Sequence, residues 1–471
     1  MGSYPSALQQ CLESVGNGRA DFAGFPGSPT YQPSWVRPYN LDLQVVPAAV
    51  VRPQTAEDVS GIVKCAAENG VKVQAKSGGH SYGNYGLGGV DGAVAIDMVK
   101  MQHFSIDNST WRATLGPGTL LGQVSERLHN AGGRAIAHGV CPAIGIGGHA
   151  TIGGLGPMSR MWGTALDHVV EVEVVTADGK IQRASETENS DLFWALRGAS
   201  SAFGIITEFV VQTHPEPGSV VQYRYTISFG NMSNIAPLFS IWLGLIKDPN
   251  LDRRFGSMFV LNPTGAFISG TFYGTQAEFE ATRIPDRFPD GPGRSLVFTD
   301  WMGSLAHNAE QMGLYLTGLP MPFACKSVAF RREDLPPPNT VAELFRWFDA
   351  QDKGTLLWFI IFDNSGGAIA EVPLNATAFA HRDKVLYYQS YAVGLPLSDT
   401  TRRFVANFHN KVLEAAPTAF GTYPGYVDPA LADAQEQYWG PHLARLREIK
   451  LKWDSTDVFQ NPQSVRVPRA D

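Results

Sequence analysis

The chain has 471 residues, of which 44% are hydrophobic and 17% charged, so it buries a large core in two or three domains, and disorder is excluded. Its net charge of −7 at pH 7 provides no basic surface for nucleic acid or an anionic membrane, and no apolar run approaches the ~18 residues that cross a bilayer. We therefore expect a small, uncharged substrate and no nucleic-acid or membrane partner. Separately, we expect a monomer.

Residues 48–215 alternate short strands with helices. One helix is expected to begin after Thr55, because Thr55 and Asp58 resemble a capping box and the apolar residues that follow share one face. A turn is expected at Asp178-Gly179. Runs of β-branched and apolar residues predict strands over 71–75, 93–97, 111–115 and 169–177. This pattern is typical of an α+β domain large enough to bind a nucleotide.

From about residue 216 to 414 the pattern changes to longer, aromatic, alternating stretches separated by proline-rich loops. Alternation of apolar and polar residues predicts strands, for example over 223–229 and 356–362. We therefore expect a second domain built on a broad sheet.

The C-terminal segment has the spacing of a single helix. Leu446 and Ile449 fall on one face, and Lys450 and Lys452 supply the positive charge that favours the last turn of a helix. We expect this helix to end near Asp454.

The four cysteines are Cys11, Cys65, Cys141 and Cys325. They lack the close pairs of a zinc site, so no metal is expected. Cys11 lies in an amphipathic N-terminal stretch and Cys65 in the expected helix. These two form either a disulfide that holds the N-terminus or two buried thiols.

Three N-x-Ser/Thr sites, at Asn108, Asn231 and Asn375, are typical of a glycosylated secreted protein. The N-terminus shows no basic and apolar signal region. Because a signal peptide is removed on secretion, we expect an extracellular protein whose signal is absent from this sequence.

Glycine is concentrated in three segments, 78–83, 145–149 and 153–156. Such loops point successive backbone N–H groups at an anion and can bind a pyrophosphate, although each segment alone is also explained by a structural turn. The G-x-G-x-x-G pattern of a Rossmann fold, with its later acid, and the Walker A pattern are absent. Three clusters so close together favour a dinucleotide site.

These segments belong to longer motifs: KSGGHSY from Lys76, HGVCPAIGIGGH from His138 and DLFWALRG from Asp191. The motifs resemble those of the berberine bridge enzyme-like flavoproteins, the bicovalent FAD branch of the vanillyl-alcohol oxidase fold. Within that family, the chain looks most similar to the fungal glucooligosaccharide and xylooligosaccharide oxidases. The resemblance covers almost the whole chain and is most specific in the first half.

The resemblance implies an α+β, two-domain fold of the vanillyl-alcohol oxidase type. Residues 1–215 would form the first part of the FAD-binding domain, and residues 216–414 a substrate-binding domain with a large antiparallel sheet covered by helices. Residues 415–471 would return to the FAD-binding domain, because a base near residue 426 has to reach the flavin.

The implied cofactor is FAD, joined through His80 to the 8-methyl group of its ring system and through Cys141 to ring carbon C6. An imidazole nitrogen and a thiolate are nucleophiles able to add to an electron-poor flavin. Outside their motifs, these residues would more simply be a turn histidine and a small core residue. Further cofactor contacts are implied for Gly78, Gly79, Ser81, Gly145, Gly147, Gly148, His149, Gly153, Gly154 and Ile205.

Two positions depart from the family pattern. After Arg197-Gly198 the related oxidases usually continue a glycine run, whereas this chain has Ala199-Ser200-Ser201-Ala202, which predicts a tighter backbone near the cofactor. Ile144 stands where a valine thought to gate oxygen is usual. Isoleucine there leaves the rate of the oxygen reaction open.

The family's catalytic base is a tyrosine that takes the hydroxyl proton while hydride leaves the anomeric carbon. Tyr426 matches it best, and Tyr423 is the alternative. A tyrosine with a pKa of about 10 is a poor base at neutral pH. Asp363 matches the acid that assists it, although a solvated carboxylate at a strand end would look the same. Tyr82 is expected beside the ring, as a catalytic residue that contacts substrate.

Gln389 matches a sugar-binding glutamine of the family. Ile361 stands where the glucooligosaccharide oxidases carry a second glutamine, and the loss of a buried amide removes a hydrogen bond worth about 1 kcal/mol. The pocket is therefore expected to be more apolar than a glucose site, which leaves xylose-type and non-sugar substrates open.

The resemblance implies an FAD-dependent oxidase that transfers a hydride from the anomeric carbon of an oligosaccharide to flavin, giving a lactone and, with oxygen, hydrogen peroxide. Two other functions stay open. One is an oxidase or dehydrogenase of a secondary-metabolite alcohol or phenol, and the other is a flavin-free carbohydrate-binding protein. A binding protein would not need His80 and Cys141 beside glycine-rich loops, which disfavours it.

Overall fold

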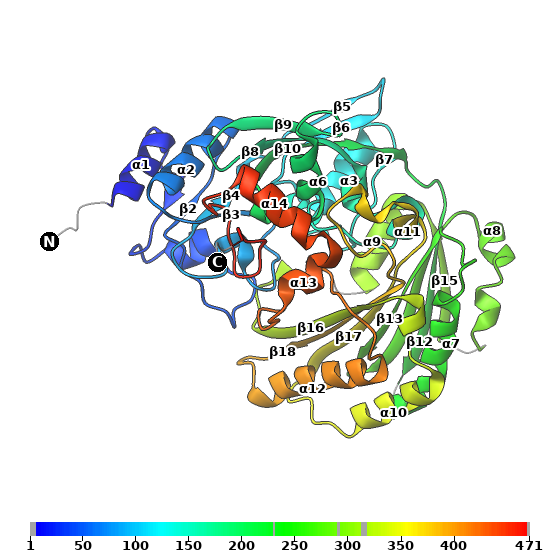
Figure 1. The fold of residues 1–471 in the computed structure, drawn as a ribbon. Helices are drawn as coiled ribbons and strands as arrows, with labels where there is room; N and C mark the ends of the chain where they lie inside the picture. The colour runs from blue at the N-terminus through cyan, green and yellow to red at the C-terminus, as the bar shows by residue number, and fades with distance from the viewer. Residues whose placement is uncertain (1–5, 229–230, 290–292, 312–317, 469–471) are drawn as a thin grey trace.

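The computed structural model describes residues 6–228, 231–289, 293–311 and 318–468, arranged as an upper and a lower half in the view of Figure 1. The upper half contains a sheet with the strand order β1-β2-β4-β3, in which β2, β4 and β3 run parallel and β1 antiparallel. These strands are β1 Ala23–Gly24, β2 Ala49–Val51, β3 Val73–Lys76 and β4 Val94–Asp97.

A five-stranded antiparallel sheet, in the order β5-β6-β10-β8-β9, completes the upper half with the short pair β7 and β11. Leu115, Val172 and Phe209 of this sheet are buried together with Leu192 and Leu196 of α6. The strands are β5 Phe104–Asp107, β6 Arg112–Leu115, β7 Arg134–Ala135, β8 Val169–Val175, β9 Ile181–Ser185, β10 Ile205–Gln212 and β11 His214–Pro215.

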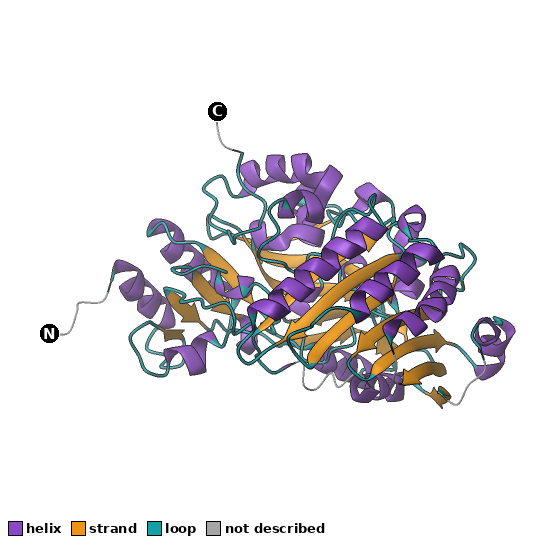
Figure 2. Ribbon diagram, turned by 90° about the horizontal axis from the view of Figure 1, so that it is seen from below, coloured by secondary structure: helices purple, strands orange, loops and turns teal. Residues whose placement is uncertain are grey.

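The lower half is built on a seven-stranded antiparallel sheet in the order β15-β12-β14-β13-β17-β18-β16. Helices α7, α10 and α12 cover one face, as Figure 2 shows from below, and bury Phe259, Ile360 and Tyr388 there with Trp242. Because side chains alternate along a strand, those on the other face of the sheet point toward the upper half. The strands are β12 Val220–Ser228, β13 Phe255–Asn262, β14 Gly265–Tyr273, β15 Arg294–Thr299, β16 Phe323–Phe330, β17 Leu357–Asn364 and β18 Leu386–Val393.

The C-terminal segment leaves α12 in the lower half and returns to the upper one, where α13 and α14 lie beside α6 (Figure 1). Lys450 of α14 holds this segment against the upper half. Its fully buried ammonium donates to the carbonyl oxygens of Ala202 and Phe459, at 2.7 and 2.9 Å, and to the Asp454 carboxylate at 2.7 Å. Phe459 also forms a parallel bridge with Val73 of β3.

The helices have the following bounds: α1 Ala7–Gly16, α2 Ala56–Glu68, α3 Leu121–Asn130, α4 Ile146–His149, α5 Ser159–Trp162, α6 Ser190–Ala199, α7 Ala236–Ile246, α8 Gln276–Ala281, α9 Trp301–Gln311, α10 Pro338–Asp349, α11 Ala368–Glu371, α12 Asp399–Ala415, α13 Ala434–Trp439 and α14 Leu443–Trp453. The predicted α+β class and the large antiparallel sheet covered by helices are confirmed. The last helix ends as predicted, with Asp454 as its C-cap.

One N-terminal prediction is confirmed, and one alternative that the sequence left open, a disulfide or two thiols at Cys11 and Cys65, is decided. Thr55 caps α2 by accepting the Asp58 N–H at 3.2 Å. Cys11 and Cys65 form a disulfide that joins α1 to α2, while Cys141 and Cys325 are buried thiols.

Several strand boundaries were wrong for local reasons. The strand predicted from residue 111 begins at Arg112, because Trp111 has φ 56° and its N–H donates to Asp107 O in a turn. The strand predicted to end at 177 ends at Val175, where the predicted turn at Gly179, with φ 73°, begins. The strand predicted over 223–229 begins earlier, at Val220, and its last predicted residue, 229, lies outside the described residues.

Candidate active site

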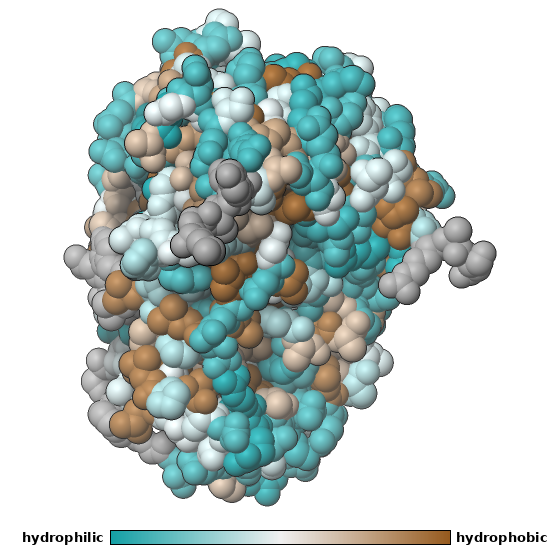
Figure 3. Space-filling view, turned by 90° about the vertical axis from the view of Figure 1, so that its left-hand side faces the viewer, coloured by the Kyte–Doolittle hydropathy of each residue, from teal (hydrophilic) through white to brown (hydrophobic). Residues whose placement is uncertain are grey.

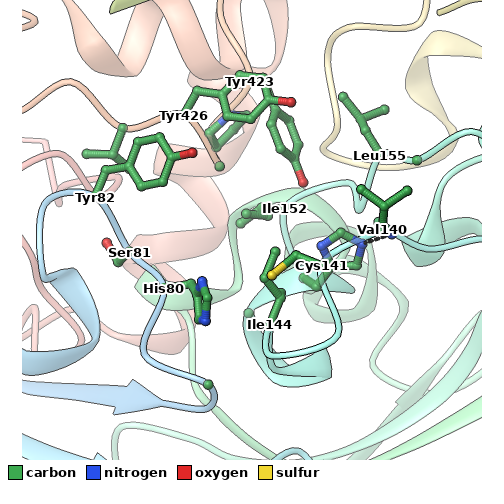
Figure 4. Close-up of a pocket in the computed structure, with 18 of the residues that line it drawn as sticks. His80, Ser81, Tyr82, Val140, Cys141, Ile144, Ile152, Leu155, Tyr423 and Tyr426 are labelled. Atoms are coloured by element: carbon green, nitrogen blue, oxygen red, sulfur yellow. Dashed lines mark hydrogen bonds between the residues drawn. The ribbon is translucent and has the colours of Figure 1, made fainter. Parts of the chain in front are cut away.

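A cavity of about 910 Å³ lies between the two halves. The side that the upper half of Figure 1 contributes lies below in the view of Figure 4 and is called the floor: it consists of the glycine-rich loop after β3 and the loop that precedes α4. The roof of the cavity is the open face of the seven-stranded sheet, joined by the loop between α12 and α13. Residues from both halves and from the returning C-terminal segment therefore meet in one space.

His80 reaches this space from the loop after β3. Its ring lies against Tyr39, with 4.6 Å between ring centroids. Burial lowers the pKa of His80 to about 4, so the imidazole is neutral at physiological pH. A neutral imidazole has a free lone pair and can act as a nucleophile.

Cys141 reaches the cavity from the opposite loop, and Figure 4 shows its sulfur and the His80 ring extending into the same space. Two histidines hold the peptide of Gly139, just before Cys141. His149 Nε2 accepts the Gly139 N–H at 2.9 Å, and His138 Nδ1 lies 2.7 Å from the Gly139 carbonyl oxygen. His138 Nε2 in turn contacts Ser125 Oγ at 2.8 Å. This network holds the backbone two residues before Cys141 in place.

Glycine is required where the two floor loops meet. A Cβ on Gly78 would lie 2.4 Å from Gly145 N, and a Cβ on Gly145 would lie 2.2 Å from Gly78 N. The backbones can approach only because neither residue has a side chain. The predicted cofactor residues that line the cavity are Gly78, Gly79, His80, Ser81, Cys141, Gly145, Gly147, Gly148, His149 and Ile205.

Gly153 and Gly154 are placed differently from the prediction, since neither lines the cavity. The Gly154 N–H donates to Tyr423 Oη at 2.9 Å, so this amide is already used within the protein. Both residues have positive φ, and a Cβ on Gly153 would lie 2.9 Å from the rings of Phe379 and Tyr423. Gly153 and Gly154 therefore shape the chain under Tyr423, while Leu155 and Gly156 of the same cluster line the cavity.

The segment that departs from the family pattern, Ala199-Ser200-Ser201-Ala202, passes into a short 3-10 helix over Ser200–Ala202. Ser200 and Ser201 line the cavity next to Gly204 and Ile205. The Ser201 carbonyl oxygen accepts from Gln74 Nε2 at 2.9 Å, which ties this segment to β3.

Tyr426 and Asp363 form a pair in the roof: Tyr426 Oη donates to Asp363 Oδ2 at 3.3 Å. Burial raises the pKa of Asp363 to about 6, although the hydrogen bond from Tyr426 opposes this rise. Burial, and then the negative charge of Asp363, raise the pKa of Tyr426 well above its ordinary value. At neutral pH the proton therefore resides on Tyr426, and Asp363 is a carboxylate.

Tyr423, the alternative base, is placed less well for that role. Its hydroxyl accepts from the Gly154 N–H, and its ring meets the Tyr426 ring edge-on, at 5.1 Å between centroids. Figure 4 shows Tyr423, Tyr426 and Tyr82 around one end of the cavity, above His80 and Cys141.

Tyr82 lies between the floor and the roof. Its ring is stacked near that of Tyr426, at 6.4 Å between centroids, and its hydroxyl donates to Gln389 Oε1 at 3.5 Å. Gln389 of β18 is paired in register with Ile361 of β17. The structure thus brings the predicted catalytic and substrate-binding residues Tyr82, Asp363, Gln389 and Tyr426 together.

Sequence reasoning missed Tyr39, whose ring supports His80 and also lies near Tyr82, at 6.2 Å between centroids. It precedes the motifs and lies in a loop with no recognisable pattern. Asn84 holds this loop in place, since its Oδ1 accepts the N–H groups of Tyr39 and Asn40 at 3.0 and 3.1 Å.

Within the described ranges, no group of three or more His, Cys, Asp or Glu side chains could hold a metal ion. In the same ranges no helix has the length and apolar character needed to cross a membrane.

Two family descriptions match the chain: an FAD-binding domain over residues 47–185, and "Berberine and berberine like" over residues 422–466. The first range contains His80, Cys141 and the glycines of the cavity floor. The second contains Tyr423 and Tyr426.

Comparison with known proteins extends the likeness to the whole chain. It is 37% identical to the FAD-linked oxidoreductase sorD of Penicillium rubens, over 98% of each chain. Among solved structures it is similar to the xylooligosaccharide oxidase of Myceliophthora thermophila in complex with xylobiose, with a TM-score of 0.88, 31% identity, and coverage of 99% of this chain and 100% of the other.

A second solved structure is the glucooligosaccharide oxidase of Acremonium strictum, described with a 6-S-cysteinyl, 8α-N1-histidyl FAD. It has a TM-score of 0.87 and 29% identity, and the match covers 99% of this chain and 100% of that one. Identity above one third along nearly the full length of a relative, together with the two matched segments, establishes the family. The chain belongs to the berberine bridge enzyme-like family of FAD-linked oxidoreductases.

Proposed function

We propose that the protein is an FAD-dependent oxidase that removes a hydride from the anomeric carbon of an oligosaccharide, giving a lactone, and reduces oxygen to hydrogen peroxide. The observation that carries the proposal is the Tyr426–Asp363 hydrogen bond in the roof of the cavity that His80 and Cys141 enter from below. The similar solved structure that is named a xylooligosaccharide oxidase supports the choice of substrate, as does Gln389 beside Tyr82.

The cavity residues fit FAD held through two side chains, with His80 at the 8-methyl group and Cys141 at ring carbon C6. His80 offers a neutral imidazole, and the clamped Gly139 peptide presents the Cys141 thiol from the other loop. Because Gly78 and Gly145 have no side chains, the two floor loops come close together and bring backbone N–H groups to the cavity, where these groups suit a pyrophosphate. When bound, FAD supplies the group that accepts the hydride.

Tyr426 removes the proton of the reacting hydroxyl. In this mechanism Tyr426 Oη takes that proton while its own proton moves to Asp363 Oδ2. No free phenolate has to form, which matters because burial and the Asp363 charge both raise the pKa of Tyr426. A positioned base of this kind contributes about 10²- to 10⁴-fold in rate.

The test is the variant Tyr426→Phe, which keeps the ring and removes only the phenolic oxygen. Anaerobic mixing with the best oligosaccharide should reduce its flavin about 10²- to 10⁴-fold more slowly than in the parent, while the protein stays yellow after acid precipitation. Flavin reduction at the parent rate would reassign the base, and Tyr423→Phe would then be measured in the same way.

A second candidate is the oxidation of an alcohol or phenol of the secondary-metabolite type. It is favoured by Ile361, an apolar residue in the cavity roof that lies next to Gln389 on the neighbouring strand. A hydrogen peroxide assay across oligosaccharides and aromatic alcohols separates the two candidates. Slow peroxide formation together with fast flavin reduction would indicate that Ile144 restricts oxygen and that the protein works as a dehydrogenase.

We propose the same domain division as the sequence predicts, with residues 1–215 and 415–471 around FAD and 216–414 as the substrate domain. The contacts of Lys450 with Ala202 and Phe459 support it. We also propose a secreted, glycosylated monomer. The Cys11–Cys65 disulfide supports this location, because disulfides persist in oxidising compartments.

A further inference from the structure

Four cavity residues form one row across neighbouring strands of the roof. In the pairing of the sheet, Asp363 of β17 stands opposite Met258 of β13, and Met258 stands opposite Ser269 of β14. Ser269 in turn stands opposite Arg224 of β12. All four residues line the cavity. Neighbouring strands lie about 4.8 Å apart, so this row places Arg224 roughly 14 Å from Asp363 on the same face of the sheet.

The two ends of this row carry opposite charges. Among the described residues that the seven-stranded sheet contributes to the cavity, Arg224 and Asp363 are the only charged side chains. Asp363 belongs to the catalytic pair, so it repels a negative group of the substrate from the reacting end. The Arg224 guanidinium attracts such a group to the other end. The row therefore favours one orientation of a substrate whose carboxylate is remote from the reacting carbon.

Arg224 is partly buried at the cavity wall. Most arginines of a protein are exposed among other hydrophilic residues, such as those on the face in Figure 3. The Arg224 guanidinium instead lies over the Phe267 ring, 4.2 Å from its centroid, and burial lowers the pKa of Arg224. Its Nε donates to Thr226 Oγ1 at 3.2 Å. The N–H donors of a guanidinium lie in its plane, so a carboxylate in that plane can accept two of them side by side.

Neutral polar side chains accompany Arg224 at this end of the row. Ser269 stands beside it, and Thr271 follows Ser269 on the same face of β14. Asn308 of α9, a helix that packs against β12, also lines the cavity and is only 7% exposed. Such hydroxyl and amide groups suit the hydroxyls of a sugar. This end of the roof therefore fits a carboxylate that is carried by a sugar.

We propose that the substrate is an acidic oligosaccharide, whose reducing sugar reacts at Tyr426 and whose carboxylate, on a sugar nearer the other end, binds Arg224. The inference rests on the proposed oxidation at Tyr426 and narrows its substrate class to oligosaccharides with a uronic acid unit. Because roughly 14 Å separate Arg224 from Asp363, the carboxylate belongs on a later sugar and not on the reacting one. The net charge of −7, which favours an uncharged substrate, does not show this one cation in the cavity.

Binding is measured by calorimetry with the holoenzyme of Tyr426→Phe, so that sugars bind without being turned over. The probe is aldotriouronic acid, a xylobiose that carries glucuronic acid on its non-reducing xylose, and its methyl ester is the neutral control. We expect the acid to bind about tenfold more tightly than the ester, because hydrogen bonds between charged partners add that much. Added salt should reduce this advantage and leave the affinity of the ester unchanged. Equal affinities of acid and ester overturn the proposal.

The variant Arg224→Gln, made in the same background, removes the charge and keeps hydrogen-bonding groups. It should weaken binding of the acid by about tenfold and leave the ester unchanged, so that the two bind alike. Arg224→Lys should restore part of the preference, because an ammonium attracts a carboxylate but lacks the planar fork. Arg253→Gln is the matched control and should keep the full preference, since Arg253 is 55% exposed, pairs with Glu371 and does not line the cavity.

Two results with Arg224→Gln would overturn the proposal. One is a preference for the acid that persists, and the other is an equal loss of affinity for acid and ester, which would show that Arg224 only supports the structure. The proposed oxidation is tested apart from this, by anaerobic flavin reduction of the parent enzyme with the same two sugars. Failure of both sugars to reduce the flavin would overturn that oxidation, whereas the affinities alone decide whether Arg224 binds the carboxylate.

Discussion

In the proposed mechanism Asp363 has to be ionised to accept a proton, yet burial at the cavity raises its pKa from 3.8 to about 6. The raised value brings the carboxylate closer in pKa to the group whose proton it receives, so proton transfer through Tyr426 becomes less uphill. The same shift means that the folded protein holds a proton on Asp363 more tightly than the unfolded chain does. Ionisation of Asp363 should therefore raise the rate of proton transfer and lower the free energy of unfolding.

In the parent enzyme, flavin reduction should speed up as the pH rises through about 6, because Asp363 becomes ionised. Asp363→Asn should remove that step and lower the rate, and the remaining pH dependence should move upward because only ionisation of Tyr426 itself is left. Stopped-flow flavin reduction between pH 5 and 9 checks this. A parent-like profile in Asp363→Asn would show that the carboxylate takes no part in the proton transfer.

The stability consequence has the opposite sign. Since the folded pKa of Asp363 lies above the unfolded one, its ionisation costs stability as the pH rises from about 4 to 6, and the full cost is present above pH 6. Asp363→Asn removes that cost and should be about 1–3 kcal/mol more stable than the parent at pH 7, with little difference at pH 4. Denaturant unfolding at the two pH values measures it.

Much of the candidate site could be predicted because its residues fall in short contiguous motifs. His80 and Cys141 stand inside runs of glycine whose spacing is specific, and Tyr426 and Asp363 occupy matching family positions. Tyr39 could not be found in this way, because its contact with His80 depends on a loop held by Asn84. The placement of Gly154 was missed because a sequence does not show that its amide is bonded to Tyr423.

Whether a segment forms a helix or a strand could be predicted from its pattern of apolar residues. Where that helix or strand begins and ends depended on the backbone conformation of single residues. Trp111 looked like a strand residue because aromatic residues favour strands, but its positive φ places it in the preceding turn. The pairing order of the seven-stranded sheet could not be read from the sequence, since β17 and β18 pair with each other but also with β13 and β16, distant in the chain. That order is what places Ile361 of β17 beside Gln389 of β18 in the roof of the cavity.

Helix α14 carries two lysines that test how the C-terminal segment is held. Lys450 is fully buried among Ala202, Asp454 and Phe459, whereas the Lys452 side chain is 61% exposed beside Asp191. Lys450→Met should destabilise the protein by about 3–5 kcal/mol, because it leaves the buried Asp454 carboxylate without its ammonium partner. The matched variant Lys452→Met should cost at most about 1 kcal/mol. Equal denaturation midpoints for the two variants would contradict this account of α14.

Because both halves line the cavity, we expect the bound cofactor to stabilise the whole molecule. His80→Ala and Cys141→Ala should each keep one covalent link and stay yellow after acid precipitation. The double variant should release its colour into the supernatant, and its melting temperature should then rise with added FAD, as expected for a ligand that binds only the folded state. Colour lost from either single variant would mean that only one residue is attached.

The proposed base, Tyr426, follows the flavin-binding loops and the substrate half in the chain, so it is synthesised after both. The floor of the cavity, with His80 and Cys141, leaves the ribosome first, and domains generally fold in that order. Tyr426 and the helix α14, which holds its segment in place, emerge after these loops. Because Lys450 and Phe459 of the same segment hold Ala202 and Val73 of the upper half, a chain that stops before α14 lacks both the proposed base and part of the support of its flavin-binding half.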